Sequence, residues 1–213
     1  MSNNVFFVSG IDTNIGKSYA TGYLAREWNK AGIRTITQKL IQTGNTNVSE
    51  DIELHRHLMG VGLLPEDHES LTMPEIYTYP CSPHLAAEID RRPIDFRQIE
   101  QATRELSRRY DAVLLEGAGG LMVPLTRTLL TIDYVARHEF PLILVTSGRL
   151  GSINHTLLSL EAVRARHIRL DTVAYNLFPD EEDELIRQDT QLYIQHYLKE
   201  YFPETKFITV PCL

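Results

Sequence analysis

Short apolar runs alternate along this chain with segments of helical period. Several runs are continuously apolar, which is typical of strands buried on both faces of a parallel sheet. The six runs are VFFV (5–8), IRTIT (33–37), AVLLEG (112–117), PLILVTS (141–147), LDTVAYN (170–176) and KFITVP (206–211). Helical spacing is found at 17–31, 96–110, 152–166 and 182–200. The order predicts an α/β fold with a doubly wound, mostly parallel sheet and helices on both faces.

The chain of 213 residues is long enough for one well-packed domain of this kind, and we expect residues 1–213 to form a single domain. Residues 60–84 interrupt the periodicity with Gly, Pro and acidic residues. We interpret them as a long excursion near the rim of the sheet, with IYTYP as a possible strand, and not as a linker. An Asp95–Gln98 capping box is expected before the helix that begins at Phe96.

The formal charge of −7 would repel a phosphate backbone, so we expect no nucleic-acid partner. The pairs Arg91-Arg92 and Arg108-Arg109 are interpreted as solvated helix ends. Cys81 and Cys212 lie far apart without a ligand pattern for zinc, which favours a reducing compartment. No leader pattern is read at the N-terminus, and no apolar run approaches the roughly 20 residues of a membrane span. A cytoplasmic protein without a membrane partner is expected.

The segment GIDTNIGKS, residues 10–18, joins the first predicted strand to the first predicted helix. In open α/β sheets, ligands bind beyond the carboxyl ends of the strands. A Gly-rich turn there directs backbone N–H groups and the helix dipole at one point, where Lys17 adds a cation and Ser18 a hydroxyl for Mg²⁺. Five residues lie between Gly10 and Gly16, instead of the usual four. Because strand and helix flank the loop, we interpret it as a nucleoside-triphosphate loop of the P-loop NTPase type.

Polar side chains follow the other strands at the same edge. Lys39 follows the second strand, and Glu116 ends a buried apolar strand, where a carboxylate needs a partner or a metal. Asp51 is open to two interpretations: a first-turn acid of a helix capped by Ser49, or a Mg²⁺ contact. Asn176 is equally open, either to a contact with a base edge or to a local Asx-turn.

The glycines of EGAGG, at positions 117, 119 and 120, are expected to let the backbone approach a ligand. In SGRLGSINH we expect Ser152 to cap the next helix, whose first turn would offer a second anion site. His155, in that first turn, is interpreted by default as a surface or capping histidine.

Together these segments resemble the dethiobiotin synthetase family over nearly the whole chain. The segments that carry the resemblance are GIDTNIGKS (10–18), QKLIQTG (38–44), EDIELHR (50–56), SPH (82–84), RPI (92–94), LLEGAGGLMVPL (114–125), ILVTSGRLGSINHTLLS (143–159), AYN (174–176) and VPCL (210–213). The loop with its unusual spacing, followed in order by EGAGG and GSINH, is far more specific than any one motif.

The resemblance implies a ligase of biotin biosynthesis. Such an enzyme converts 7,8-diaminononanoate, CO₂ and MgATP to dethiobiotin, ADP and phosphate, through a carbamate and a carbamic-phosphoric anhydride. Carbamate and triphosphate are both anions, so positive groups and a metal would bring them together, and no catalytic base is needed. It also implies a homodimer whose substrate site lies at the interface.

The resemblance assigns roles to named positions. Those implied in catalysis are Thr13, Lys17 and Lys39, and those implied in holding Mg²⁺ are Ser18, Asp51 and Glu116. Those implied in nucleotide binding are Asp12, Thr13, Asn14, Ile15, Gly16, Lys17, Ser18, Tyr19, Glu116, Gly119, Asn176 and Pro211. Those implied in substrate binding are Thr13, Lys39, Thr43, Gly151, Ser152, Ile153 and Asn154. Ser18 and Thr43 stand where the family often has Thr and Ser.

Three alternatives use the same architecture. A nucleotide-driven positioning switch often has a second Lys early in the loop, where this chain has IDTNI at 11–15. A regulatory ATPase without catalysis would not need Lys39, Glu116 and the GSINH turn. A glutamine-dependent amidoligase would need a further domain with Cys and His that 213 residues do not hold.

Overall fold

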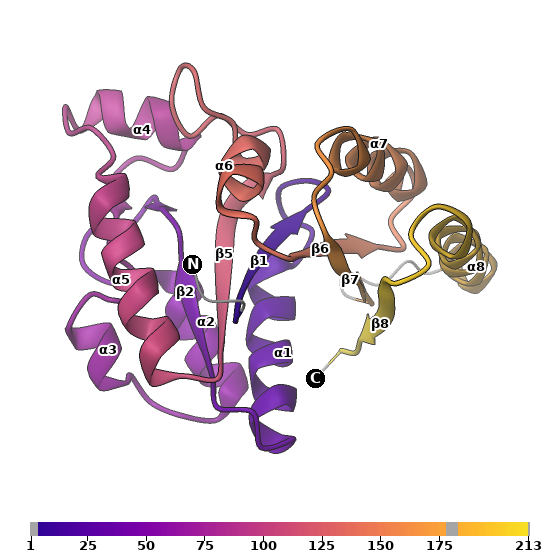
Figure 1. Ribbon diagram of the computed structural model, residues 1–213, viewed down its shortest axis with the longest axis horizontal. Helices are drawn as coiled ribbons and strands as arrows, with labels where there is room; N and C mark the ends of the chain where they lie inside the picture. Colours follow the sequence, from indigo (N-terminus) through magenta and orange to yellow (C-terminus); the bar gives the residue numbers. More distant parts are fainter. Residues whose placement is uncertain (1–3, 178–182, 213) are drawn as a thin grey trace.

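The computed structural model describes residues 4–177 and 183–212 of the chain. Its centre is a six-stranded sheet in the order β2-β5-β1-β6-β7-β8, which runs from left to right in Figure 1. Every neighbouring pair of these strands is parallel, as predicted. The strands are β1 (Val5–Gly10), β2 (Thr35–Lys39), β5 (Ala112–Gly120), β6 (Leu142–Ser147), β7 (Leu170–Asn176) and β8 (Lys206–Val210).

Helices cover both faces of the sheet, so the predicted doubly wound architecture is confirmed. One face carries α1 (Lys17–Lys30), against which α2 (Glu50–Met59) packs. The other face carries α5 (Phe96–Arg109), α6 (Thr131–His138), α7 (Ser152–Ala165) and α8 (Glu184–Tyr201). Two shorter helices, α3 (Pro65–His68) and α4 (Pro83–Ile89), lie between α2 and α5 in the chain.

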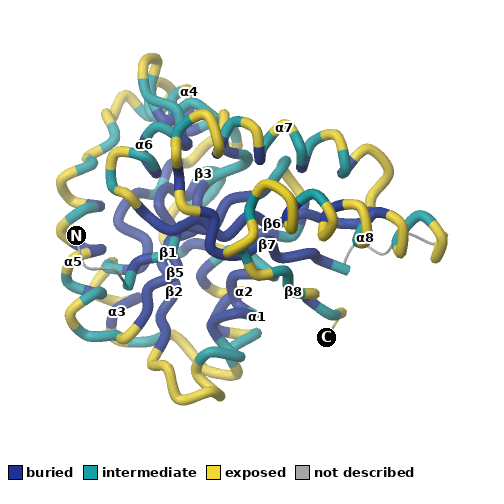
Figure 2. Tube along the Cα trace, turned by 45° about the vertical axis from the view of Figure 1, so that its right-hand side comes forward, coloured by how far each residue is buried: buried dark blue, intermediate teal, exposed yellow. Residues whose placement is uncertain are grey.

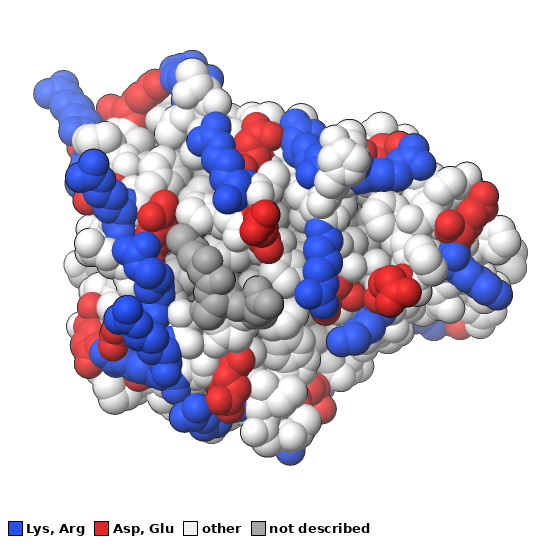
Figure 3. Space-filling view, viewed as in Figure 1, with Lys and Arg blue, Asp and Glu red and all other residues white. Residues whose placement is uncertain are grey.

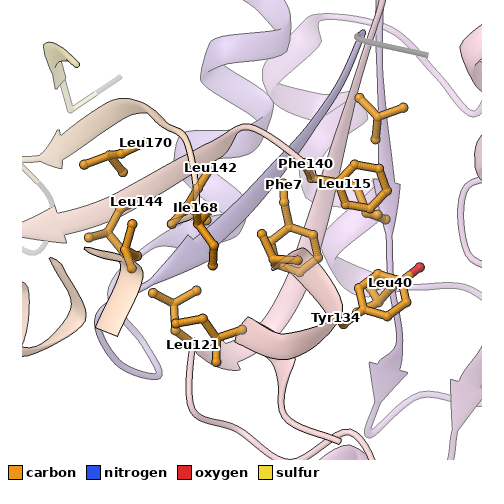
Figure 4. Packing of buried hydrophobic residues seen from close by; sticks show 14 of the residues in the cluster. Phe7, Leu40, Leu115, Leu121, Tyr134, Phe140, Leu142, Leu144, Ile168 and Leu170 are labelled. Carbon is orange, nitrogen blue, oxygen red and sulfur yellow. The ribbon is translucent and has the colours of Figure 1, made fainter. Parts of the chain in front are cut away.

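Alternation along the strands divides the core into two clusters. Phe7 points to the side of α5–α8, where its ring lies 6.4 Å from that of Tyr134 and close to Leu115 (Figure 4). The next residue, Val8, points to the side of α1, where it packs with Leu114 and Leu24. Because side chains alternate across a strand, both faces need apolar residues, which explains the continuous apolar runs. Figure 2 shows the resulting buried sheet beneath helices whose outer faces are exposed.

Residues 60–84 extend the structure along the free edge of β2. The backbone N–H of Lys39 donates to Thr72 O at 2.7 Å, and that of Gln42 donates to Glu75 O at 2.8 Å. Two short strands, β3 (Gln42–Thr43) and β4 (Ile76–Tyr77), then pair in parallel. The predicted strand at IYTYP is therefore present, and the excursion supports the chain around Lys39.

A buried ion pair fixes this excursion to α2. Arg56 and Asp67 are both at least 98% buried, and two nitrogens of the guanidinium contact the two carboxylate oxygens at 2.8 and 2.9 Å. The same carboxylate accepts from the Thr72 hydroxyl at 2.6 Å and from the Leu64 N–H at 2.7 Å. Such bidentate, fully hydrogen-bonded pairs are the form in which buried charges are tolerated.

Some local predictions were wrong. The α7 helix begins with Gly151 as its N-cap at φ 93°, a conformation that glycine adopts without strain, whereas Ser152 is buried inside the first turn. The Asp95 side chain does cap α5, but Gln98 donates to Pro74 O and does not complete a capping box. Arg92 is not simply a solvated helix end, because it pairs with the buried Glu75 and lies over the Tyr77 ring.

Charged side chains of both signs are mixed on the surface. Figure 3 shows basic side chains over α5 with acidic side chains close by, in keeping with ion pairs such as Arg109–Glu105 and Arg109–Glu69. Arg108 there is a solvated helix residue, as interpreted from the sequence. Within residues 4–177 and 183–212, no helix combines the length and apolar character that a bilayer crossing requires.

Candidate active site

The loop between β1 and α1 turns the first amide groups of α1 toward one cavity. Asn14 and Gly16 have left-handed backbone conformations, with φ of 57° and 80°, and Gly16 is the N-cap of the helix. A glycine N-cap offers no side-chain acceptor to the N–H groups of the first turn, so these donors remain for a bound group. Such an N-terminus is suited to bind an anion such as phosphate.

Gly10 explains why the loop can fold back on itself. A Cβ atom there would lie 2.5 Å from Cγ2 of Ile15 and 3.1 Å from the Asp12 carbonyl oxygen. Ile15 is buried in the α1-side core, so only its backbone can take part in ligand binding. The five-residue spacing therefore includes one side chain that anchors the loop to the core.

Lys17 points from the first turn of α1 into the cavity beside the loop. Its ammonium donates to the Asp12 carbonyl at 3.2 Å, and the side chain is largely buried. Burial lowers the pKa of Lys17 and outweighs the opposing attraction of Glu116. A cation that is poorly compensated in this way favours the arrival of an anion.

Four polar side chains from four elements meet at the floor of this cavity. Lys39, at the end of β2, forms ion pairs with Glu116 of β5 at 2.7 Å and with Asp51 of α2. Ser18 of α1 lies 2.6 Å from Asp51 Oδ1 and 2.9 Å from Glu116 Oε1. Asp51 thus does more than stabilise the N-terminus of α2, for which Ser49 supplies the predicted cap.

The Ser18 hydroxyl has one proton but two carboxylate neighbours. It can donate to only one of them, so the hydroxyl oxygen and the other carboxylate oxygen face each other as two acceptors. A cation shared by the three oxygens would relieve that contact. One hydroxyl and two carboxylates, completed by phosphate oxygens, form a donor set suited to Mg²⁺. Among the residues described by the structure, no group of three or more His, Cys, Asp or Glu side chains could hold a metal by itself.

The charges of Lys39 and Glu116 depend on each other. Burial would lower the pKa of Lys39, but Glu116 and Asp51 reverse this effect and raise it. Burial would raise the pKa of Glu116, but the Lys39 charge and a hydrogen bond from His55 hold it well below its usual range. Both groups are therefore ionised at neutral pH.

The sequence did not single out His55, which contacts the far side of Glu116. Its Nε2 lies 2.9 Å from Glu116 Oε2 and its Nδ1 lies 3.0 Å from the Thr37 hydroxyl, with the ring fully buried. Asp51 and His55 are four residues apart on α2 and so share one face. That spacing within EDIELHR was the available signal.

The cavity measures about 440 Å³ and gathers most of the predicted residues. The predicted residues among its lining are Thr13, Asn14, Gly16, Lys17, Ser18, Tyr19, Lys39, Thr43, Asp51, Glu116 and Gly119. A second hollow of about 490 Å³ lies on the other side of the loop and has a mostly apolar wall that includes Leu121, Met122 and Leu158. Thr13 lines both hollows.

Comparisons with known proteins identify relatives of this chain. A family model described as an AAA domain matches residues 4–208. The ATP-dependent dethiobiotin synthetase BioD 2 of Pasteurella multocida is 49% identical over 203 residues, which are 95% of each chain. The corresponding protein of Haemophilus ducreyi is 51% identical over 206 residues, 97% of each chain. This chain belongs to the dethiobiotin synthetase family.

Another member of the family, from Chlorobaculum tepidum, is 51% identical over 94% of this chain and 84% of its own. Among solved structures, the chloroplast FtsY of Physcomitrella patens matches with a TM-score of 0.51 at 17% identity. An FtsY from Elizabethkingia anophelis, in complex with GDP, matches with a TM-score of 0.52 at 14% identity. These matches cover 93% and 97% of this chain but only 56% of each solved structure. At such low identity they support the fold alone.

Some residues that the dethiobiotin synthetase resemblance assigns lie outside the main cavity. Gly151 and Asn154 are exposed and Ile153 is half-buried, whereas Ser152 turns inward to Ser147 at 3.3 Å. Gly151 and Ile153 instead line a separate hollow between α7 and α8. Within one chain, the 151–154 turn does not join the phosphate loop in a single cavity.

Three other positions that the resemblance assigns make hydrogen bonds outside the cavity floor: Asn176, Tyr19 and Pro211. Asn176 is fully buried, and its amide nitrogen donates to Ile15 O at 3.1 Å. The Tyr19 hydroxyl donates to Pro211 O at 3.0 Å. The Asn176 contact is to the phosphate loop, so a local Asx-turn, one of the two interpretations left open by the sequence, does not account for that nitrogen.

Asp12 lines the second hollow and not the phosphate cavity. Arg149, just before the 151–154 turn, donates to its carboxylate at 2.8 Å. That hydrogen bond is the main reason why the pKa of Asp12 lies below its usual value. His155 Nδ1 lies 3.9 Å from the same carboxylate, and the side chain is partly exposed, as expected for a surface histidine.

Gly117 was expected to let the backbone approach a ligand. Its lack of a side chain instead makes room for the Phe7 ring, since a Cβ atom there would lie 2.9 Å from that ring.

Proposed function

We propose that this protein is an ATP-dependent dethiobiotin synthetase of biotin biosynthesis, acting in the cytoplasm. It would convert 7,8-diaminononanoate, CO₂ and ATP to dethiobiotin, ADP and phosphate. Membership of the family supports the reaction, since the matched relatives carry this name. The observation that carries the proposal is the meeting of Lys39, Glu116, Asp51 and Ser18 beside the phosphate loop.

The reaction must bring two anions together. One substrate amine adds to CO₂ and loses a proton, which gives a carbamate. A carbamate oxygen then attacks the γ-phosphorus of ATP, the bond to the bridging oxygen breaks, and ADP leaves. The second amine attacks the carbamate carbon of this anhydride and loses a proton. The bond from that carbon to the phosphate oxygen breaks, and phosphate leaves as the cyclic urea closes. An oxyanion attacks in the central step, so that step needs charge stabilisation and positioning more than a base.

The described residues supply that charge. The N-terminus of α1 and the buried ammonium of Lys17 would hold the terminal phosphates. Lys39 lies on the side of the cavity that also carries Thr43, and its pKa is raised, so its ammonium would remain charged near the carbamate. Thr13 would stand between the two reacting groups, because it lines both hollows.

Ser18, Asp51 and Glu116 would hold Mg²⁺ through one oxygen each. These oxygens fit a cation because the single hydroxyl proton of Ser18 cannot be donated to both carboxylates. Mg²⁺ supplies neutralisation of developing charge on the phosphate oxygens. Glu116 is kept ionised for this role by Lys39 and His55. Asp51 is the more accessible of the two carboxylates.

The apolar hollow beside Thr13 suits the hydrocarbon chain of the diamine. Its wall includes Met122 and Leu158, and both of these large apolar side chains are exposed. The 151–154 turn of a second copy would bind the substrate carboxylate in a homodimer. The exposure of Gly151 and Asn154 supports this role, because the N-terminus of α7 at this turn would be open to a carboxylate from another copy.

ATP would lie along the phosphate loop with its base toward Asn176 and Pro211. Asn176 is fixed by the loop, and Pro211 is tied to α1 through Tyr19. Asp12, whose carboxylate contacts Arg149, and Ile15, whose side chain is buried, would contribute through the loop backbone. Asn14, Gly16 and Gly119 line the cavity and would lie beside the phosphates.

Phosphate release from MgATP and bicarbonate tests the proposal, with and without 7,8-diaminononanoate. We expect release to require the diamine and to yield a product whose mass corresponds to the cyclic urea. A Lys39→Ala variant should lose this activity by at least about 100-fold, whereas Lys30→Ala on the surface of α1 should retain it.

The competing function is a nucleotide-driven switch or regulatory ATPase of the same fold. It is favoured only by the shared loop architecture, because P-loop proteins of different function share this site. ATP hydrolysis at the same rate with and without the diamine, and no urea product, would support the switch and contradict the synthetase.

A further inference from the structure

A directed chain of hydrogen bonds leads from Arg56 to Glu116 through Thr37 and His55. Arg56 Nη1 lies 2.9 Å from the Thr37 hydroxyl, which lies 3.0 Å from His55 Nδ1. His55 Nε2 lies 2.9 Å from Glu116 Oε2. Thr37, His55 and Glu116 are fully buried and Arg56 is 2% exposed, so these contacts are shielded from competing water.

The chemistry of the two ends fixes the direction of the chain. A guanidinium can only donate, so the Thr37 oxygen accepts from Arg56. The Glu116 carboxylate, which pairs with the Lys39 ammonium through Oε1, accepts at Oε2, so His55 donates from Nε2. In a neutral His55 ring Nδ1 then carries the lone pair, so the Thr37 hydroxyl donates its proton to Nδ1. The neutral Nε2–H form of histidine satisfies every contact, whereas the Nδ1–H form would face Glu116 with a lone pair.

We propose that His55 is a positioning residue for the metal-binding carboxylate of Glu116. Held as its Nε2–H tautomer by Thr37, it binds Oε2 and leaves Oε1 as the oxygen that faces Ser18 and the cation site. This inference rests on the proposed function only in treating Glu116 as a Mg²⁺ ligand.

The two oxygens of Glu116 show this division in the structure. Oε1 lies 2.9 Å from Ser18 Oγ and 2.7 Å from Lys39 Nζ, on the cavity side. Oε2 meets His55 instead. Carboxylate ligands that are fixed by hydrogen bonds bind metals more tightly, and loss of such support typically reduces affinity about 10–100-fold.

The tautomer is measured directly by long-range ¹H–¹⁵N NMR of the histidine rings at pH 7.5. His55 is assigned by the signals that disappear in His55→Gln. We expect the pattern of a neutral ring with its proton on Nε2. A proton on Nδ1, or on both nitrogens, would overturn the proposal.

The effect on Mg²⁺ affinity is measured by titration calorimetry, in which Mg²⁺ is added to the protein in the presence of ADP. We expect His55→Leu to weaken Mg²⁺ binding about 10–100-fold while ADP binding in EDTA changes less than about twofold. His55→Gln retains a terminal donor for Oε2 and should recover most of the loss. Exposed His57 lies on the same helix, so His57→Gln is the matched control. Unchanged Mg²⁺ affinity in His55→Leu, or an equal loss in the Leu and Gln variants, would contradict a positioning role.

Thr37→Val gives a second test if His55→Leu fails to fold. It removes the hydroxyl that holds His55 Nδ1 and keeps the side-chain shape, so the tautomer signal should change and Mg²⁺ affinity should fall. Thr37→Ser keeps the hydroxyl and should resemble the wild type, and a Val variant with unchanged signal and affinity would overturn the chain. Neither NMR nor Mg²⁺ binding requires the diamine, so failure of the synthetase assay would leave these results interpretable.

Discussion

Lys39 and Glu116 are register partners on the neighbouring strands β2 and β5, and their side chains form an ion pair 2.7 Å long. Both side chains are at least 95% buried. The sheet itself therefore fixes the distance between a cation that would face carbamate and a carboxylate that would face Mg²⁺. Lys39 is the last residue of β2, whereas β5 continues beyond Glu116 to Gly120, so Glu116 does not end its strand as expected from the sequence. The parallel register still places both groups toward the carboxyl edge of the sheet, where ligands bind.

Replacing Lys39 by Met should destabilise the fold by about 3–5 kcal/mol at pH 7.5, because Glu116 would lose its main opposing charge in a buried site. In the wild type the pKa of Glu116 is lowered, so its stabilising contribution is complete above the unfolded value of about 4.3 and lost below it. In the variant, burial raises that pKa. The stability difference should therefore shrink as the pH falls from 7.5 toward 5, as measured by urea unfolding.

The raised pKa of Lys39 adds no slope in this window, because its contribution is lost only at alkaline pH, as the pH rises through the folded value. Lys30→Met, at an exposed ion pair with Glu27, should change stability by less than about 1 kcal/mol at either pH. A Lys39→Met deficit that stays constant from pH 7.5 to 5 would show that Glu116 does not carry the penalty.

Gly22→Ala should destabilise the protein by about 1–3 kcal/mol, although alanine is the better helix former. A Cβ on Gly22 would lie 2.8 Å from Leu58 Cδ1 and 3.0 Å from the Cα of His55. The α2 helix would have to move away from α1, and its Asp51 would move with it. Urea unfolding and Mg²⁺-dependent ADP binding should both weaken.

Gly62→Ala is the control for this change, since a Cβ there would meet no atom within 4 Å and its φ is not in the left-handed range. It should be neutral or slightly stabilising. If Gly22→Ala were as stable as Gly62→Ala, the close approach of α1 and α2 would not be limiting.

The sequence predicted the sheet well because each buried strand is an apolar run. It also singled out Glu116, because a carboxylate at the end of such a run is costly without a partner, and Lys39, because it follows a strand on the same rim as the phosphate loop. The helices α3 and α6 were not predicted, because four and eight residues are too few to establish a period. Their positions are set by tertiary packing, as when Tyr134 of α6 meets Phe7.

The support behind the site was harder to predict. His55 and Arg56 follow Asp51 in a segment rich in charged residues, which resembles a solvated helix face. Their partners Thr37 and Asp67 lie 18 and 11 residues away. The packing of α2 against β2 brings Thr37 to His55, and the position of α3 brings Asp67 to Arg56. Buried polar contacts depend on this three-dimensional pairing, which a one-dimensional pattern does not contain.

The Arg56–Asp67 pair should behave as a buried ion pair in a double-mutant cycle. Arg56→Met or Asp67→Asn alone should cost about 3–5 kcal/mol, because each leaves a buried polar group without its partner. The double variant should cost less than the sum, with a coupling of about 1–3 kcal/mol in urea unfolding. The lowered pKa of Asp67, held down by Arg56 against its burial, predicts that wild-type stability falls as the pH drops through that pKa. Additive effects would exclude a coupled pair.

Ser18 should be needed for metal-dependent nucleotide binding through its hydroxyl, which lies within 2.9 Å of both Asp51 and Glu116. Ser18→Ala should weaken MgADP binding about 100-fold, whereas Ser18→Thr keeps the hydroxyl and should remain within a few-fold. At an MgADP concentration of about 100 times the wild-type Kd, the nucleotide should stabilise the wild type by about 2.7 kcal/mol and the Ala variant by about 0.4 kcal/mol. Thermal unfolding with MgADP and with ADP in EDTA measures this difference. Equal stabilisation of the Ala and Thr variants by MgADP would remove Ser18 from the metal site, and a difference that persists in EDTA would place its role in phosphate binding instead.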